Sequence, residues 1–296
     1  MTACISLRTR LREGTMVVAP GAYDAIGARL IEQAGFEAAY MTGAGTSAAR
    51  GFPDFGLLSM TEMVDNAAVM ARAVRIPLVA DADTGYGNEL NVTRTVHEYE
   101  ARGVAAIHLE DQVAPKRCGH LDGKEVVDRQ AFVSKISAAV QARRSADFLI
   151  IARTDARAVL GLDEAVWRAN AALDAGADAA FVEATQTIEE AAAVPRLVHG
   201  PCLLNIVPGG RTPVFDTRVA QDMGYRLAIL PGIVLKAVIE AVDGALAGLR
   251  ETGIASSGHT PVAQTFRRFG ADEWDALRAR FDAGQRAVPQ DGATQP

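Results

Sequence analysis

The sequence has little cysteine, no surplus of basic residues and no long apolar run. Its three cysteines, Cys4, Cys118 and Cys202, lie far apart without pair spacing, which argues against a disulfide framework or a zinc site and favours a reducing compartment. The net charge of −6 offers no basic surface for nucleic acid or an anionic membrane. No apolar segment reaches membrane-spanning length, and the arginine-bearing N-terminus lacks the apolar centre of a signal peptide. We therefore expect a cytoplasmic protein with neither a nucleic-acid nor a membrane partner.

Short apolar runs recur along the chain and alternate with helical patterns. The runs are almost continuously apolar, which is typical of strands buried on both faces of a parallel sheet. Several helical patterns end in a glycine, at Gly35, Gly103 and Gly176, where a left-handed residue stops a helix. The predicted strands lie at 16–20, 38–43, 77–83, 104–111, 148–155, 178–184, 202–206 and 226–232. Eight strand–helix repeats predict a (β/α)₈ TIM barrel.

The domain organisation follows from the length and from the apolar content. With 296 residues, 49% of them apolar, the chain can form one large core, but this length leaves one or two domains open. Because the repeats predict one barrel, we predict a single domain over residues 1–296. The barrel is expected to cover about 14–249, a C-terminal helical extension about 250–286, and a disordered tail 287–296. The helices after the last strand exceed what barrel closure needs, so their apolar surface packs either on the barrel or on another subunit.

Acidic residues gather where two neighbouring predicted strands end. The active site of such a barrel lies at the carboxyl ends of its strands. Asp81 and Asp83 end the third strand and Glu110 ends the fourth. Carboxylate oxygens on neighbouring strands suit Mg²⁺, with waters and substrate oxygens completing an octahedron. Alternatively, single acids among them cap helices or pair with arginines. The presence of three favours the metal site.

An arginine is expected at the same edge of the barrel. Arg153 follows the apolar run of the fifth strand, so its guanidinium emerges close to the three acids. Its fork of donors suits a substrate carboxylate. Asp155 and Glu183 are alternative partners in a salt bridge, and both interpretations can hold together.

A cysteine with charged neighbours follows the fourth strand. Cys118 lies in the sequence PKRCGH, between Lys116, Arg117 and His120, and Gly119 makes the loop mobile. The positive neighbours are expected to lower the pKa of the thiol. This favours a reactive acid/base or nucleophilic group over the alternative, a small buried hydrophobic residue. For Cys4 and Cys202 we expect the alternative, a small buried hydrophobic residue.

Six motifs in this order resemble the isocitrate lyase/phosphoenolpyruvate mutase superfamily. They are DADTGYGN, HLEDQ, KRCGH, ARTDA, VEA and LLNI with GGRTP, and the resemblance runs from about Gly14 to Leu249. It implies a TIM barrel that exchanges its last helix between subunits and assembles as a homotetramer, a dimer of swapped dimers. It also implies Mg²⁺, with Mn²⁺ as a possible substitute, held partly through water by Asp81, Asp83 and Glu110.

The resemblance implies a reaction and a set of site residues. The loop around Cys118 resembles the gating loop of the carbon–carbon lyases, in which the cysteine protonates a departing carbanion. A base, for which Tyr40 is the candidate, takes the hydroxyl proton of a 2-hydroxy acid, the C2–C3 bond breaks, and Mg²⁺ with Arg153 stabilises the enolate-like fragment. The implied catalytic residues are Cys118, Tyr40, His120, Lys116 and Arg117, and the implied substrate-binding residues are Thr42, Gly43, Ala44, Asp54, Arg153, Glu183 and Asn205.

The resemblance leaves several reactions open. The compact lyases of the family cleave 2-methylisocitrate or 2,3-dimethylmalate and related 2-alkylmalates to a 2-oxo acid such as pyruvate and a carboxylate. KRCGH resembles the first type, whereas NIVPGGRTP resembles the second. Alternatives are an oxaloacetate hydrolase or decarboxylase, a phosphonate mutase or hydrolase, and a non-catalytic dicarboxylate-binding barrel. Cys118 argues against a mutase, and the complete set of acids argues against a non-catalytic protein.

Overall fold

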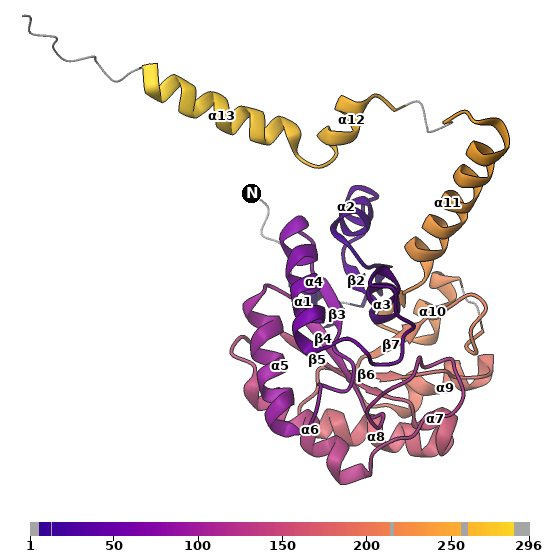
Figure 1. Cartoon of the computed structure of the whole chain (residues 1–296). Coiled ribbons are helices and arrows are strands. Elements are labelled where there is room, and N and C mark those ends of the chain that lie inside the picture. The colour runs from indigo at the N-terminus through magenta and orange to yellow at the C-terminus, as the bar shows by residue number, and fades with distance from the viewer. Residues whose placement is uncertain (1–5, 13, 214–215, 256–259, 287–296) are drawn as a thin grey trace, which may run out of the picture. The chain divides into compact units, whose positions relative to one another are not determined.

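Eight parallel strands form a closed barrel in sequence order, and the first strand pairs with the last. The computed structural model describes residues 6–12, 14–213, 216–255 and 260–286. Our interpretations of Cys4 and of the tail 287–296 lie outside these residues. Figure 1 shows helices of residues 1–240 around the strands. The predicted (β/α)₈ barrel is therefore confirmed.

The strands overlap all eight predicted runs. They are β1 (Val17–Ala22), β2 (Ala39–Met41), β3 (Leu78–Asp81), β4 (Ala106–Glu110), β5 (Leu149–Thr154), β6 (Ala179–Val182), β7 (Cys202–Asn205) and β8 (Leu227–Leu230). The helices are α1 (Leu7–Arg12), α2 (Ala25–Gln33), α3 (Gly43–Ala49), α4 (Met60–Ala73), α5 (Glu89–Ala101), α6 (Arg129–Ala142), α7 (Ala156–Val159), α8 (Leu162–Asp174), α9 (Ile188–Leu197), α10 (Thr217–Met223), α11 (Ile233–Thr252), α12 (Val262–Arg267) and α13 (Ala271–Arg286).

Local sequence explains where several helices begin and end. Ser59 and Glu62 form a capping box at the start of α4, in which each side chain accepts the other residue's backbone N–H. The predicted helix stops are confirmed, because Gly35, Gly103 and Gly176 have φ values of 86°, 80° and 101°. The short helices α1, α3 and α7 were not predicted, since four to seven residues carry too little periodicity to be detected.

Side-chain alternation on the strands decides which residues reach the active site. On β4, Ala106 belongs to the cluster inside the barrel, whereas Ile107 and Leu109 pack in the layer beneath the helices. His108 and Glu110 therefore share the inner face with Ala106. Leu7 and Leu11 of α1 belong to the same inner cluster. The interior is thus a packed core, and on β4 the polar residues His108 and Glu110 follow Ala106 toward the carboxyl end of the strand.

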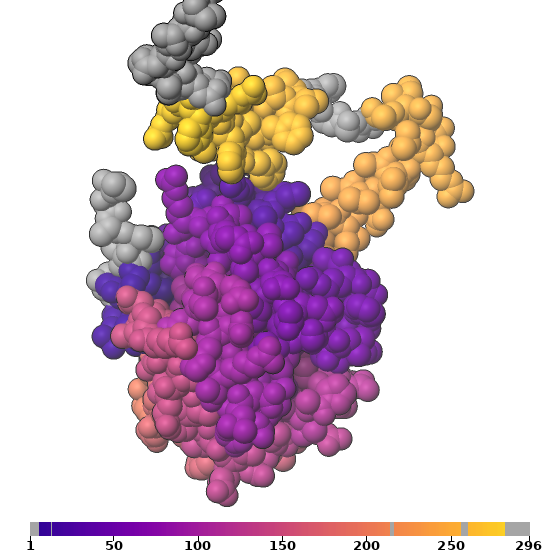
Figure 2. Space-filling model, turned by 60° about the vertical axis from the view of Figure 1, so that its left-hand side comes forward, coloured from indigo at the N-terminus to yellow at the C-terminus, as the bar shows by residue number. Residues whose placement is uncertain are grey.

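The chain divides into two compact units, residues 1–240 and 241–296. The first unit holds the barrel, and Figure 2 shows the outer surface of its helices in indigo to magenta. The second unit holds the C-terminal part of α11 together with α12 and α13. The single domain over 1–296 stays a prediction. None of the described helices is long and apolar enough to cross a membrane.

Candidate active site

A cavity of about 120 Å³ lies at the carboxyl ends of the strands. A larger groove of about 1020 Å³ on the outside of the barrel, lined by residues of α5, α6 and α8, contains none of the predicted site residues. Ten of the predicted residues line the cavity: Tyr40, Thr42, Ala44, Asp54, Asp81, Cys118, His120, Arg153, Glu183 and Asn205. The fold therefore brings together groups that the sequence spreads over more than 160 positions.

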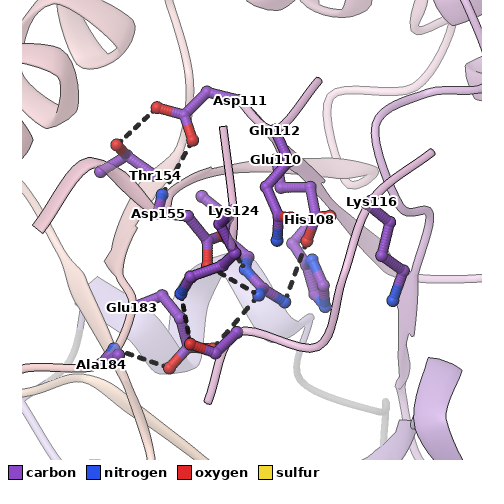
Figure 3. A network of polar contacts seen from close by, with 12 residues as sticks. His108, Glu110, Asp111, Gln112, Lys116, Lys124, Thr154, Asp155, Glu183 and Ala184 are labelled. Carbon is purple, nitrogen blue, oxygen red and sulfur yellow. Dashed lines mark hydrogen bonds and ion pairs between the residues drawn. The ribbon is translucent and has the colours of Figure 1, made fainter. Parts of the chain in front are cut away.

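Arg153 is buried at the centre of an acidic cluster. Its Nη1 lies 3.1 Å from Glu110 Oε2, its Nη2 lies 3.4 Å from Glu183 Oε2, and its Nε donates a 2.9 Å hydrogen bond to Asp155 Oδ2. Figure 3 shows Glu110, Asp155 and Glu183 within one network of polar contacts. Although burial opposes its charge, the carboxylates raise the pKa of Arg153 well above its ordinary value. Both interpretations of Arg153 are compatible with this geometry, because it pairs with Asp155 and Glu183 and also lines the cavity.

The three predicted metal ligands lie at or just beyond the carboxyl ends of β3 and β4, and one of their oxygens lacks a donor. Glu110 Oε1 is buried and receives no hydrogen bond from a described residue, whereas Glu110 Oε2 lies 3.1 Å from Arg153 Nη1 and Asp83 Oδ1 lies 3.0 Å from Lys116 Nζ. Burial raises the pKa of Glu110 well above its ordinary value and that of Asp83 to about 6. Burial also opposes the charge of Asp81, but neighbouring positive groups lower its pKa to about 2. A buried carboxyl oxygen without a donor, beside two further buried carboxyl groups, fits a hard divalent cation.

The acids do not form a complete metal cage by themselves. In the part of the chain that the structure describes, no three acidic, histidine or cysteine side chains converge closely enough to enclose an ion. Mg²⁺ commonly keeps several waters and uses only one or two protein carboxylates. The arrangement therefore agrees with a cation held largely through water.

Lys116 and Arg117 have different surroundings although they are adjacent in sequence. The Lys116 ammonium is buried, contacts a carboxylate oxygen of Asp54 and lies 3.0 Å from Asp83 Oδ1. The Arg117 guanidinium lies 5.5 Å from the centre of the Phe55 ring and does not line the cavity. The structure therefore brings Lys116 to the acidic cluster, whereas Arg117 is placed outside it.

Tyr40 and His108 form a buried pair that the sequence did not reveal. The Tyr40 hydroxyl lies 2.9 Å from His108 Nε2 and 3.4 Å from Asp81 Oδ2. Burial lowers the pKa of His108 to about 4, so the ring is neutral at pH 7. Burial and the charge of Asp81 raise the pKa of Tyr40 well above its ordinary value. The phenol thus keeps its proton at rest, and the role of Tyr40 as the base stays a prediction.

The expected low pKa of Cys118 is wrong. The thiol is half-buried and lines the cavity. Burial, together with the nearby charge of Asp54, raises its pKa above the ordinary value. The positive neighbours fail to lower it, because Lys116 pairs with carboxylates and Arg117 lies over Phe55. A thiol that holds its proton is suited to donating a proton rather than to attacking as a thiolate.

His120 is fixed by a loop that follows β7. The Arg211 backbone N–H donates a 3.0 Å hydrogen bond to His120 Nδ1, so the ring proton of the neutral form lies on Nε2. Nε2 is 3.6 Å from Glu183 Oε1, and burial lowers the pKa of the ring. Gly210 is required at this contact, because a Cβ there would lie 2.7 Å from His120 Nδ1.

Asn205 presents an unpaired acceptor at the cavity. Its Nδ2 donates a 3.0 Å hydrogen bond to Glu183 Oε2. Its Oδ1 is buried and receives no hydrogen bond from any described residue. Gly43, another predicted contact, uses its backbone N–H to bond Asp81 Oδ2 at 3.2 Å. A substrate hydroxyl would satisfy the free oxygen of Asn205.

Two site residues besides His108 were missed. Lys124 is buried against Asp155, and Arg168 is buried against Asp111. Their charge alone gave no signal, since most lysines and arginines are exposed. Their partners lie 31 and 57 positions away in sequence, so only the fold identifies the pairs.

The fold and the site define a TIM-barrel enzyme whose cavity combines a carboxylate cluster, a buried arginine and a loop-borne thiol. The family model for phosphoenolpyruvate phosphomutase matches residues 7–250. The 2,3-dimethylmalate lyase of Eubacterium barkeri is 45% identical over 267 residues, which are 87% of this chain and 92% of the relative. The 2-methylisocitrate lyase of Aeropyrum pernix is 43% identical, over 83% of this chain and 80% of the relative. This chain belongs to the phosphoenolpyruvate mutase/isocitrate lyase superfamily, as its motifs predicted.

Solved structures show the same similarity over almost the whole chain. A crystal structure of 2,3-dimethylmalate lyase has a TM-score of 0.90 at 41% identity and covers 100% of this chain and 99% of its own. Oxaloacetate acetylhydrolase with 3,3-difluorooxalacetate has a TM-score of 0.89 at 40% identity, covering 96% and 97%. Phosphonopyruvate hydrolase in complex with oxalate and Mg²⁺ has a TM-score of 0.85 at 34% identity, covering 95% and 99%. The predicted enzyme class, a carbon–carbon lyase, is confirmed by the similarity to named lyases.

Proposed function

We propose that this chain is a Mg²⁺-dependent lyase that cleaves the C2–C3 bond of a 2-alkylmalate, such as 2,3-dimethylmalate, into pyruvate and a carboxylate. The observation that carries the proposal is the protonated, half-buried thiol of Cys118 in the same cavity as Arg153 and the carboxylates of Asp81 and Glu183. The similarity to 2,3-dimethylmalate lyase over the full chain supports it.

The carboxylate cluster is the proposed place for the cation. Asp81, Asp83 and Glu110 would hold Mg²⁺ with water, and the buried oxygen of Glu110 that receives no hydrogen bond, Oε1, supports this assignment. When bound, the ion supplies positive charge that stabilises negative charge developing on substrate oxygens. The Mg²⁺ and oxalate in the similar phosphonopyruvate hydrolase structure also support the assignment.

The first proton transfer is assigned to the Tyr40–His108 pair. Tyr40 takes the proton of the substrate hydroxyl as it passes its own proton to His108 Nε2, 2.9 Å away. A neutral imidazole is required for this step, and burial keeps His108 neutral. The hydroxyl oxygen then forms the carbonyl of pyruvate as the C2–C3 bond breaks. The electron pair of that bond passes to C3 as an enolate-like carbanion.

Cys118 completes the reaction by protonating C3. Arg153 lines the same cavity, and its charge stabilises the carbanion's carboxylate. Once the thiol has released its proton to carbon, the proton on His108 returns to the thiolate through Tyr40 or water, so no net proton is consumed. Closure of the loop over the cavity excludes water, which would otherwise compete as the proton source.

The cavity walls favour a 2-alkylmalate over 2-methylisocitrate. Ala44, Val207, Pro231 and Leu235 give the cavity an apolar side. The basic residue of the GGRTP segment, Arg211, instead contacts Asp122 and donates a 3.1 Å hydrogen bond to the His120 carbonyl. A third substrate carboxylate therefore meets alkyl groups rather than a free cation, and desolvating it without a partner is costly.

The test is a proton NMR time course of the purified protein with Mg²⁺. 2,3-Dimethylmalate, 2-methylisocitrate, oxaloacetate and phosphoenolpyruvate are supplied separately. Pyruvate with propionate from 2,3-dimethylmalate is the expected result. Pyruvate with succinate from 2-methylisocitrate alone would move the assignment to that substrate, and turnover of phosphoenolpyruvate or oxaloacetate alone would refute it.

Cys118→Ser tests the role of the thiol. Losing a positioned proton donor is expected to lower kcat about 10²- to 10⁴-fold, while substrate binding is retained. Cys202→Ala is the matched control, because Cys202 is buried in β7 away from the cavity. Wild-type turnover by Cys118→Ser would remove the thiol from the mechanism.

The helix exchange and the homotetramer implied by the resemblance belong to the same proposal. Val242, Leu246 and Leu249 of α11 are 47%, 59% and 43% exposed, and no residue of this helix is buried. An apolar helix of this kind supports burial against another subunit. Analytical ultracentrifugation is expected to show a tetramer, and a monomer at micromolar concentration would contradict it.

A further inference from the structure

The segment that carries Cys118 and His120 is closed at its base. We call residues 112–126 the thiol loop. Gln112 and Val126 form an antiparallel bridge, and the Val113 N–H donates a 2.8 Å hydrogen bond to the Glu125 carbonyl. The two ends of the thiol loop are therefore held side by side. Movement of Cys118 and His120 then depends on contacts within the thiol loop and on contacts between the loop and the barrel.

Lys124 is the residue of the thiol loop that reaches back into the barrel. It is only 8% exposed, and its ammonium donates a 2.9 Å hydrogen bond to Asp155 Oδ1 and a second one to the Gly119 carbonyl. Figure 3 shows Lys124 directed at Asp155. Lysine is rarely buried unless it is paired. Because Gly119 stands between Cys118 and His120, this contact fixes the backbone beside both side chains.

Asp155 connects that contact to the arginine of the cavity. One of its oxygens accepts from Lys124, and the other accepts a 2.9 Å hydrogen bond from Arg153 Nε. The Asp155 N–H donates a 2.8 Å hydrogen bond to Asp111, so the carboxylate cannot easily follow the loop. Although burial opposes the charge of Asp155, Arg153 and Lys124 lower its pKa to about 2, which keeps both hydrogen bonds charge-assisted.

The thiol loop also packs directly on the same cluster. A Cβ on Gly119 would lie 2.6 Å from Arg153 Nη2 and 2.6 Å from Glu183 Cγ. The backbone of the loop therefore covers the arginine with no room for a side chain. Opening the loop would remove both this cover and the Lys124 ammonium, leaving Asp155 with Arg153 alone.

We propose that Lys124 is a positioning residue that latches the thiol loop to Asp155, so that loop closure and the orientation of Arg153 are coupled. The effect of this latch on turnover rests on the proposed lyase function, whereas its effect on loop opening is independent of that function. Lys124 does not line the cavity, so it acts through Gly119 and Asp155 rather than on the substrate.

The experiment measures loop opening without any turnover. Cys118 is alkylated with iodoacetamide in the absence of substrate, and peptide mass spectrometry follows its modification and that of Cys202. Lys124→Met is expected to raise the alkylation rate of Cys118 about tenfold or more, because a charge-assisted buried contact of the closed loop is lost. Lys124→Arg, which keeps the charge and a donor, is expected to remain within about threefold of wild type. Lys135→Met is the matched control, since Lys135 is a part-buried lysine of α6 that contacts the Thr84 carbonyl.

Hydrogen exchange of the amides of residues 112–126 separates loop opening from a change in thiol acidity. Faster exchange together with faster alkylation in Lys124→Met is the expected result. Faster alkylation without faster exchange, or wild-type rates of both, would overturn the proposal. Should Lys124→Met fail to fold, Lys124→Gln keeps a donor without the charge and is subject to the same two measurements.

Kinetics then tests the coupling to Arg153. Lys124→Met is expected to lower kcat/KM about tenfold or more on the substrate that wild type cleaves, with recovery in Lys124→Arg. Unchanged kinetics in a variant with an opened loop would refute the coupling. If wild type cleaves none of the candidate substrates, the proposed function fails, and the alkylation and exchange results still decide whether Lys124 is the latch.

Discussion

The buried pair of Asp111 and Arg168 supplies a prediction whose pH dependence can be worked from the structure. Arg168 Nη1 lies 3.1 Å from Asp111 Oδ2 and donates a 2.8 Å hydrogen bond to the Val127 carbonyl. Asp111 also accepts hydrogen bonds from the Thr154 hydroxyl and the Asp155 N–H. The pair therefore supports the backbone that carries the acid next to Arg153.

Arg168→Met is expected to destabilise the protein more at pH 8 than at pH 5. Burial raises the pKa of Asp111 from 3.8 to about 6, so its carboxyl already carries a proton at pH 5 and needs Arg168 little there. Above pH 6 the wild-type carboxyl ionises, whereas without Arg168 it avoids a bare buried charge by keeping its proton. In the unfolded state Asp111 is ionised at these pH values. The free energy of unfolding of the variant therefore continues to fall as the pH rises past 6, because its folded state holds one proton more than its unfolded state.

The size of this effect follows from the pKa. One pH unit corresponds to about 1.36 kcal/mol, so the protonation part of the loss is near zero at pH 5, about 1.4 kcal/mol at pH 7 and about 3 kcal/mol at pH 8. The lost hydrogen bond to the Val127 carbonyl adds about 1–3 kcal/mol at every pH. The assay is urea unfolding of wild type and Arg168→Met at pH 5 and pH 8, at one protein concentration.

Asp111→Asn provides the control, because an amide does not titrate. In the Asp111→Asn background, Arg168→Met should lower the free energy of unfolding by the same amount at both pH values, and the four proteins form a double-mutant cycle. A loss of equal size at pH 5 and pH 8 with Asp111 present would refute the reasoning.

Two further variants test the cavity by steady-state kinetics. Gly119→Ala is expected to lower kcat/KM tenfold or more, because its Cβ would lie 2.6 Å from Arg153 Nη2 and must displace the thiol loop or the guanidinium; unchanged kinetics would show that the loop has room there. Tyr40→Phe removes the hydroxyl that lies 2.9 Å from His108 Nε2 and is expected to lower kcat about 10²- to 10⁴-fold. Wild-type turnover would remove Tyr40 from the reaction.

The strands of the barrel were predictable because local physics decides them. The run 148–155 begins with five consecutive apolar residues, as a strand covered on both faces requires, and β5 (Leu149–Thr154) lies within that run. The same runs located the site, since Asp81, Glu110 and Arg153 occupy the carboxyl ends of their strands. One rule of barrel geometry therefore placed Asp81 and Arg153 in the cavity, and the resemblance to a known superfamily implied most of its other polar residues.

The chemical state of those residues was decided only by the tertiary structure. The neighbours of Cys118 in sequence predicted a lowered thiol pKa, but Lys116 turns to Asp54 and Asp83, and burial raises the pKa instead. Likewise, nothing local distinguishes Lys124 from an exposed lysine until the fold places it against Asp155. Sequence by itself determined the barrel and the placement of polar groups, because periodicity and strand ends are local properties. Ionisation and pairing depend on burial and on charges tens of residues apart, which exist only once the chain has folded.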